Sequence, residues 1–130
     1  MSETTLKRIG WVMSALFALF MFGASATPKL AGMAVAQDTM TGLGWPDAPL
    51  ILIGCMEVAF TLLFLFPPTA LLGAILMMGV LGGAIATNLH AHAPLYSNTL
   101  FSIYLGTFMW TALLCRDKRI RDVFWLKPRA

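Results

Sequence analysis

Charged side chains are scarce in this sequence. Asp, Glu, Lys and Arg make up 12% of its 130 residues, against about 25% in an ordinary soluble domain. Hydrophobic residues make up 58%, and the mean hydropathy is +0.77. A chain of this length cannot hide so much apolar surface in one small core, so the excess must face lipid. The composition therefore predicts a single membrane domain over residues 1–130.

Cysteine is also nearly absent. Cys55 and Cys115 fall near opposite ends of different apolar stretches, so a disulfide between them would have to cross most of the hydrocarbon layer. There is no CxxC pair, no flavin or nucleotide motif and no pair of haem ligands within an apolar stretch. His90 and His92 have no Cys or carboxylate nearby in the sequence, so we expect no metal site. The sequence therefore argues against a dithiol mechanism within one chain.

Four long apolar stretches are present, and each is about long enough to cross a bilayer as a helix. They are residues 9–26, 50–66, 70–89 and 99–115. The alternation typical of barrel strands does not occur, and unpaired backbone groups are not tolerated in lipid, so the stretches should be helical. The first also resembles a signal peptide, but its apolar run exceeds the usual ~7–15 residues, and we interpret it as a helix. The predicted fold class is an all-α membrane protein with four transmembrane helices in an up-down bundle.

Lys and Arg are concentrated in the flanks of these stretches. Lys7 and Arg8 precede the first stretch, and six more basic residues lie in the basic tail of residues 116–130. The segment 88–98 has none. By the positive-inside rule, both termini are predicted to be cytoplasmic. A basic cluster beside an apolar stretch is typical of a membrane-surface anchor, so we expect the lipid bilayer and no nucleic acid as partner.

The segment between the first two stretches is too long to be a bare turn. Met33, Ala36, Met40 and Leu43 recur in it at helical spacing. We therefore predict a short helix on the outer surface, ended by Gly44-Trp45-Pro46 with Trp45 at the interface.

One carboxylate lies inside an apolar stretch. Glu57 is about 10 Å from the outer end of the second stretch, where a charge is costly unless it is paired, protonated or hydrated. Lys29 closes the first stretch on the same side, and its long stem can reach down toward Glu57. Together with Asn88 and His90, these two residues form a candidate polar site for a ligand. The alternative is that Glu57 only fixes helix register by pairing with Lys29.

Glycines mark the faces through which the helices are expected to pack. Gly54 lies one turn before Glu57, Gly79 and Gly83 form a GxxxG pair, and Gly106 lies in the fourth stretch. Small residues allow close approach of helix backbones in a membrane. We therefore predict helix contacts at all four glycines.

Several short motifs occur in an order that resembles the DoxX-like family. They are Lys29-Leu30, Leu43-Gly44-Trp45-Pro46, Ile53-Gly54-Cys55-Met56-Glu57, Pro67-Pro68 and Gly83-Ala84. The resemblance implies a compact four-helix bundle, usually in the inner membrane of a bacterium. Relatives are described as small subunits associated with quinol or thiosulfate:quinone oxidoreduction, and distant ones as membrane chaperones or cargo receptors. Many members carry a His where this chain has Asn88, with His90 two positions later.

Two functional interpretations remain open. In the first, the chain is a redox-linked accessory subunit that binds a quinone or similar lipophile near Glu57, and electron transfer needs a partner protein or the quinone itself. In the second, it is a non-enzymatic scaffold or chaperone that docks another membrane protein, or a copy of itself, through small-residue helix faces. A transporter fits less well, because the chain is small and shows no clear inverted repeat.

Overall fold

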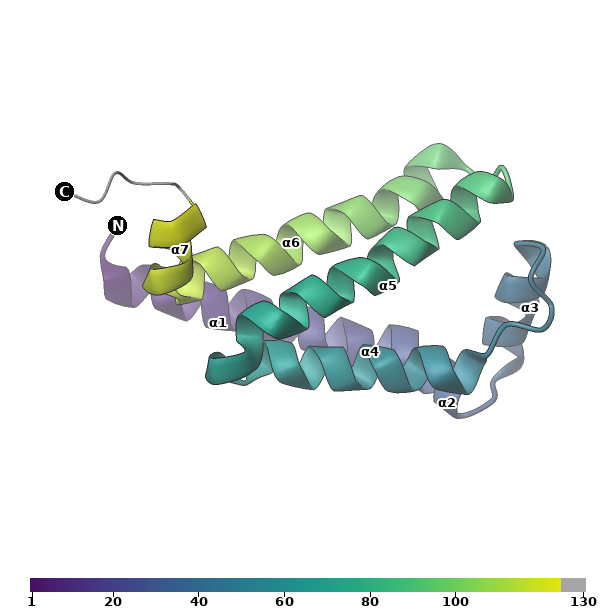
Figure 1. Ribbon diagram of the computed structural model, residues 1–130, viewed down its shortest axis with the longest axis horizontal. Coiled ribbons are helices and arrows are strands. Elements are labelled where there is room, and N and C mark those ends of the chain that lie inside the picture. Colours follow the sequence, from purple (N-terminus) through teal and green to yellow (C-terminus); the bar gives the residue numbers. More distant parts are fainter. Residues whose placement is uncertain (125–130) are drawn as a thin grey trace.

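The computed structural model describes residues 1–124, and the regular structure in this range is helical (Figure 1). Helix α1 (Glu3–Phe20) continues through the π-helical segment η1 (Met21–Ala26) into α2 (Thr27–Leu30). The chain then forms α3 (Ala34–Gly42), α4 (Leu50–Leu65), the short helix η2 (Pro67–Thr69) and α5 (Ala70–His90). A second π-helical segment, η3 (Leu95–Thr99), leads into α6 (Leu100–Arg116), which is followed by α7 (Lys118–Phe124).

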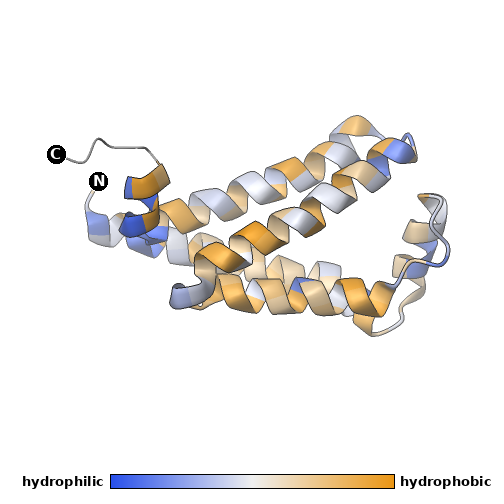
Figure 2. Ribbon diagram, viewed as in Figure 1, coloured by the Kyte–Doolittle hydropathy of each residue, from blue (hydrophilic) through white to orange (hydrophobic). Residues whose placement is uncertain are grey.

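Three helical segments within residues 1–124 are long and apolar enough to cross a membrane. They are Glu3–Leu30, Pro67–His90 and Leu95–Arg116. Helix α4 has 16 residues, which gives a length of about 24 Å against a hydrocarbon core of about 30 Å. Apolar residues run along all four of these segments (Figure 2), and Leu19 and Ile51 are 70% and 67% exposed. The all-helical class is therefore confirmed for the described residues, and the chain is a membrane protein.

The helices pack mainly as two pairs, α1 with α6 and α4 with α5, and α5 also contacts α6. Figure 1 shows these four helices close together near the N-terminus and α7, whereas toward α3 helices α5 and α6 diverge from α4 and the end of α1. We call these two regions the packed end and the open end. The core lies toward the packed end, where the rings of Phe17 and Phe64 meet edge to face with centroids 5.3 Å apart.

Two helices, α3 and α5, end with the same backbone motif at the open end. After α3, Gly44 has a φ of +81°, and the N–H of Trp45 donates to the carbonyl of Met40 at 2.9 Å. After α5, His92 has a φ of +54°, and the N–H of Ala93 donates to the carbonyl of Asn88 at 3.0 Å. This geometry satisfies carbonyls that a helix end leaves unpaired. The short helix predicted before Gly44 is therefore present, and His92 has a backbone role in a turn.

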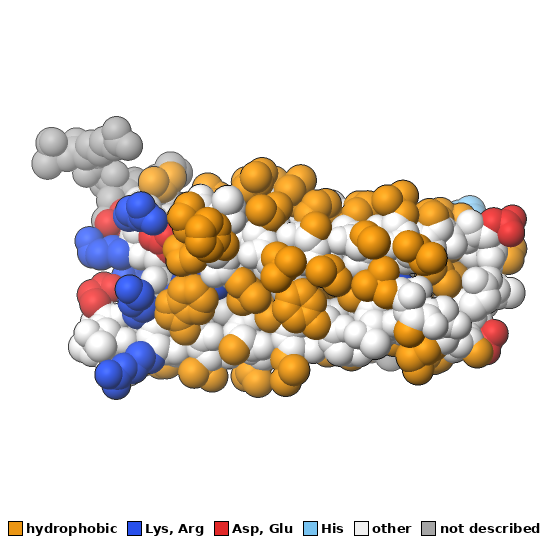
Figure 3. Space-filling model, turned by 90° about the horizontal axis from the view of Figure 1, so that it is seen from below, with side chains coloured by type: hydrophobic (Ala, Val, Ile, Leu, Met, Phe, Trp, Pro, Cys, Tyr) orange, Lys and Arg blue, Asp and Glu red, His pale blue; other side chains and the backbone are white. Residues whose placement is uncertain are grey.

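The first part of the predicted basic tail is folded. Arg116 is buried as the last residue of α6, and α7 is joined to the start of α1 by an ion pair of 2.7 Å between Arg121 Nη2 and Glu3 Oε2. Lys127 and Arg129 of that tail lie outside the described residues. Lys and Arg side chains gather at the packed end, beside a band of hydrophobic side chains (Figure 3).

Candidate functional site

Lys29 and Glu57 are in direct contact at the open end. The Nζ atom of Lys29 lies 3.0 Å from Oε1 and 3.2 Å from Oε2 of Glu57. The same ammonium donates to the carbonyl and the hydroxyl of Ser25, at 2.9 and 3.1 Å, so its three N–H groups all have acceptors. Glu57 is only 4% exposed. The ion pair therefore supplies the counter-charge that a buried carboxylate requires.

The local sequence explains how Lys29 reaches α4. Pro28 has no backbone N–H, so the α-helical ladder cannot continue through it, and the preceding turn takes the wider π-helical form of η1. On the facing helix, a Cβ added at Gly54 would lie 2.9 Å from Cδ2 of Leu30. A larger residue at position 54 would therefore push α2 away from α4. Gly54 permits the close approach that brings Lys29 to Glu57.

A cavity of about 620 Å³ lies beside this ion pair. It is bounded by residues of η1, α2, α3, α4, α5, η3 and α6, and most of the wall is apolar, with Phe20, Val80 and Leu105 among the lining residues. Lys29 lines the cavity whereas Glu57 does not, so the carboxylate lies behind the ammonium. The arrangement places an ammonium, paired with a buried carboxylate, at the edge of an apolar space.

Several further polar side chains line the same space, and Asn88 and Ser102 are two of them. Asn88 lines the cavity, and its amide donates to the carbonyl of Ala84 at 2.8 Å. Ser102 also lines the cavity and is 7% exposed, and within residues 1–124 its hydroxyl has no hydrogen-bond partner. Ser102 therefore offers a free donor and acceptor to a molecule in the cavity.

Three of the predicted site and packing residues have a different environment from the one expected. His90 is exposed at the end of α5 and does not line the cavity. Gly79 and Gly83 line the cavity instead of a helix contact, and a Cβ added at either would meet no atom within 4 Å. The reason is that α5 and α6 diverge together from α4 and η1, which leaves this face of α5 without a neighbour. Gly106 does lie at a contact, since its Cβ would be 3.3 Å from Sδ of Met78.

A family model described as the DoxX-like family matches residues 12–112. The chain belongs to the DoxX-like family. The matched range contains the Lys29–Glu57 pair and every residue that lines the open-end cavity. No curated protein and no solved structure matches the chain significantly.

This DoxX-like chain has a second polar centre, which sequence reasoning missed. Arg116 is 7% exposed at the packed end. Its Nη1 donates to Oγ of Ser14 at 2.8 Å, and its Nη2 donates to the carbonyl of Phe64. The guanidinium also lies over the rings of Trp11 and Phe64, with its central carbon Cζ 4.4 Å from each ring centroid. Arg116 therefore joins three helices through neutral groups and aromatic faces.

Two glycines that were not singled out make this centre possible. A Cβ at Gly10 would lie 2.5 Å from the backbone N of Arg116, and a Cβ at Gly73 would overlap the backbone of Phe64. The spacing of Gly10 and Ser14 on one face of α1 is the sequence signal that could have indicated the contact.

Proposed function

We propose that this DoxX-like protein crosses the inner membrane four times, with both termini in the cytoplasm, and holds a lipophile with a polar head group, such as a quinone, in the open-end cavity. The observation that carries this proposal is an apolar cavity with the Lys29 ammonium at its edge and the free hydroxyl of Ser102 in its wall. Its volume of about 620 Å³ falls within the range of about 300–1,000 Å³ that is usual for small-molecule sites.

Helix α4 is proposed as the fourth span because its outer face is apolar. Ile51, Leu62 and Phe66 are 67%, 54% and 61% exposed, which suits contact with lipid tails. Among the described residues, Lys29 is the only Lys or Arg at the open end, and this asymmetry supports cytoplasmic termini. A reporter fused after Ala130 should be active only in the cytoplasm, and a fusion active on the outer side would contradict this orientation.

The residues present fit a quinone head group. Because its three N–H groups are engaged by Ser25 and Glu57 and its charge is balanced by Glu57, Lys29 supplies a polar edge to the cavity and no free donor. The hydroxyl of Ser102 can donate to a carbonyl oxygen of the head group, while the apolar walls enclose the ring. When bound, the quinone would supply the redox chemistry, and the chain would bind and orient it. Glu57 acts here as a positioning residue that holds Lys29 in place.

Two glycine variants provide a matched test. Gly83 lines the cavity, and the Cβ introduced by Gly83→Leu would meet no atom within 4 Å, whereas Gly82→Leu changes a neighbouring exposed glycine that does not line it. After lipid extraction and mass spectrometry, the parent and Gly82→Leu should carry stoichiometric lipophile. Gly83→Leu should have lost it while keeping its melting temperature in detergent. Equal lipophile content in all three proteins would contradict the proposal.

A second candidate function is docking of a transmembrane helix from another membrane protein or a second copy. Gly79, Gly82 and Gly83 are all exposed, and a Cβ at any of them meets no atom within 4 Å, so a foreign helix could approach closely. In that case Gly82→Leu and Gly83→Leu should both reduce co-purification of a partner or self-association. A lipophile site requires an effect of Gly83→Leu alone.

A further inference from the structure

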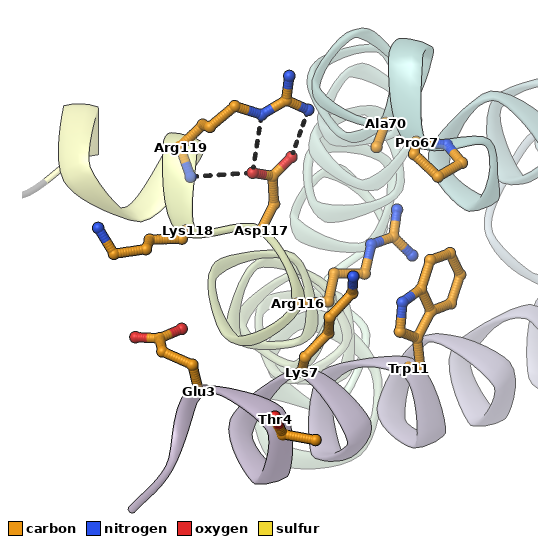
Figure 4. A pocket seen from close by; sticks show the side chains of 10 residues that line it. All are labelled: Glu3, Thr4, Lys7, Trp11, Pro67, Ala70, Arg116, Asp117, Lys118 and Arg119. Atoms are coloured by element: carbon orange, nitrogen blue, oxygen red, sulfur yellow. Dashed lines mark hydrogen bonds and ion pairs between the residues drawn. The ribbon is translucent and has the colours of Figure 1, made fainter.

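A separate cavity of about 460 Å³ lies at the packed end, and it shares no lining residue with the open-end cavity. It is bounded by the start of α1, the turn before α5, the end of α6 and the start of α7 (Figure 4). Four of its lining residues are cationic, namely Lys7, Arg116, Lys118 and Arg119, and two are acidic, Glu3 and Asp117. The cavity therefore carries an excess of positive charge.

Both carboxylates are already engaged by other partners. Figure 4 shows the Asp117 carboxylate turned toward Arg119, with Oδ2 3.4 Å from Nη2 of Arg119 and Oδ1 accepting from the Arg119 backbone N–H at 2.9 Å. Glu3 pairs with Arg121, which does not line the cavity. Lys118 pairs with Asp122 at 3.2 Å. Arg119 and Lys118 are thereby neutralised, but the remaining two cations are not.

Lys7 and Arg116 have no ion-pair partner within residues 1–124. Arg116 is 7% exposed, and its contacts are the Ser14 hydroxyl, a backbone carbonyl and two aromatic rings. A buried cation with only neutral partners retains much of its desolvation cost. A second cation on the same cavity adds repulsion. An anion in the cavity would relieve both.

We propose that this cavity binds a phosphate group, with Arg116 and Lys7 as the residues that contact it. Guanidinium and ammonium groups together suit phosphate oxygens, and Arg116 uses only some of its N–H donors within the protein. Trp11, Pro67 and Ala70 give the cavity an apolar side. Figure 3 shows that the Lys and Arg side chains gathered at this end adjoin the hydrophobic band. This boundary is the depth at which the head group of an anionic phospholipid lies. A soluble phosphate would present the same chemistry.

The lipid arm of the test compares two neighbouring basic residues. Lys7→Gln removes a lining cation, while Arg8→Gln removes an exposed cation of the same helix that does not line the cavity. Native mass spectrometry of the full chain in neutral detergent would measure retention of phosphatidylglycerol and of phosphatidylcholine with identical acyl chains. The parent and Arg8→Gln should prefer phosphatidylglycerol. Lys7→Gln should bind it about fivefold more weakly, with phosphatidylcholine unchanged.

The soluble arm uses inorganic phosphate against chloride at equal ionic strength, with the melting temperature as readout. If phosphate raises the melting temperature of the parent and of Arg8→Gln, but not that of Lys7→Gln, the site binds soluble phosphate. Dependence on Lys7 in the lipid arm alone would assign it to a lipid head group. The proposal would be overturned if Lys7→Gln and Arg8→Gln weakened binding equally, or if neither lipid binding nor the effect of phosphate on the melting temperature depended on Lys7.

Discussion

Glycine has opposite roles at the packed end and the open end of this molecule. At the packed end, a Cβ at Gly10 or Gly73 would run into the backbone of a neighbouring helix. At the open end, a Cβ at Gly79 or Gly83 would meet no atom within 4 Å. The first pair of glycines brings helices together, whereas the second pair widens a cavity. Small residues in a membrane helix therefore permit close approach, but the rest of the fold decides whether a neighbour takes the space.

The charged groups at the two ends differ in a similar way. At the open end, the ammonium of Lys29 is neutralised by Glu57 at 3.0 Å. At the packed end, Arg116 is held by neutral groups, with no carboxylate in salt-bridge range among the described residues. An internal ion pair stabilises local structure without net charge, while a cation with neutral partners can still attract an anion. The two cavities should therefore select different ligands.

The largest expected effect tests the contrast between the glycines. Gly73→Ala should lower the free energy of unfolding by about 3 kcal/mol, because its Cβ overlaps the backbone of Phe64 and the helices must separate. Gly79→Ala should be neutral or stabilise by up to about 1 kcal/mol, because alanine favours the helix and has free space there. Thermal unfolding in detergent, followed by circular dichroism, would measure both. Equal destabilisation by the two substitutions would show that both ends are tightly packed.

The next effect concerns Arg116. Arg116→Ala should cost about 2–3 kcal/mol of stability, because the hydrogen bonds to Ser14 and to the Phe64 carbonyl are lost together with the aromatic contacts. Arg116→Lys should restore little of this stability, since an ammonium cannot reproduce the planar guanidinium that donates to two acceptors at once. Arg119→Ala is the control, because Arg119 is exposed and pairs only locally with Asp117. An Arg116→Lys variant as stable as the parent would show that a positive charge at this position is enough to stabilise the fold.

Much of the open end could be predicted from sequence. The depth of Glu57 in an apolar stretch demands a partner, and Lys29 is the only cation within reach on that side, so their contact follows from cost and geometry. The end of α3 was predictable because Gly44 can adopt a positive φ without strain. These features depend on one or two residues and their local chemistry.

Other features depend on tertiary placement and could not be predicted. The GxxxG pair at Gly79 and Gly83 has the same local pattern whether or not a helix lies against it, so only the divergence of α5 and α6 from α4 and η1 decides its environment. Arg116 was interpreted as part of a basic tail because an Arg after an apolar stretch is usually a topology signal. Its burial requires Gly10 and Ser14 from the opposite end of the chain.

A smaller effect is expected for the ion pair at the open end. Glu57→Gln should cost about 1–2 kcal/mol, since the amide keeps a hydrogen bond to Lys29 but loses the charge. If the pair is mainly structural, exchanging the charges by combining Lys29→Glu with Glu57→Lys should restore much of the stability that either change removes. Lipophile content should fall in Glu57→Gln if Lys29 must be held at the cavity edge. A stable Glu57→Gln variant that retains the lipophile would contradict a positioning role for Glu57.

The smallest expected effect concerns Asp117, which caps α7 at the packed end. Partial burial alone would raise the pKa of Asp117, but the hydrogen bonds and the positive charge of Arg119 together hold this pKa below its ordinary value of 3.8. A carboxyl with a depressed pKa stabilises the folded state above its unfolded pKa, and this contribution is lost as the pH falls through the folded pKa.

Asp117→Asn keeps an acceptor for the cap but removes the charge. The parent should therefore melt slightly higher than Asp117→Asn at about pH 6, and the difference should shrink as the pH falls below 3.8 and vanish below the folded pKa. Arg119→Gln should reduce the difference at the higher pH, because the main charge partner is gone. A difference that stays constant with pH would mean that the cap, and not the ion pair with Arg119, stabilises this end of the bundle.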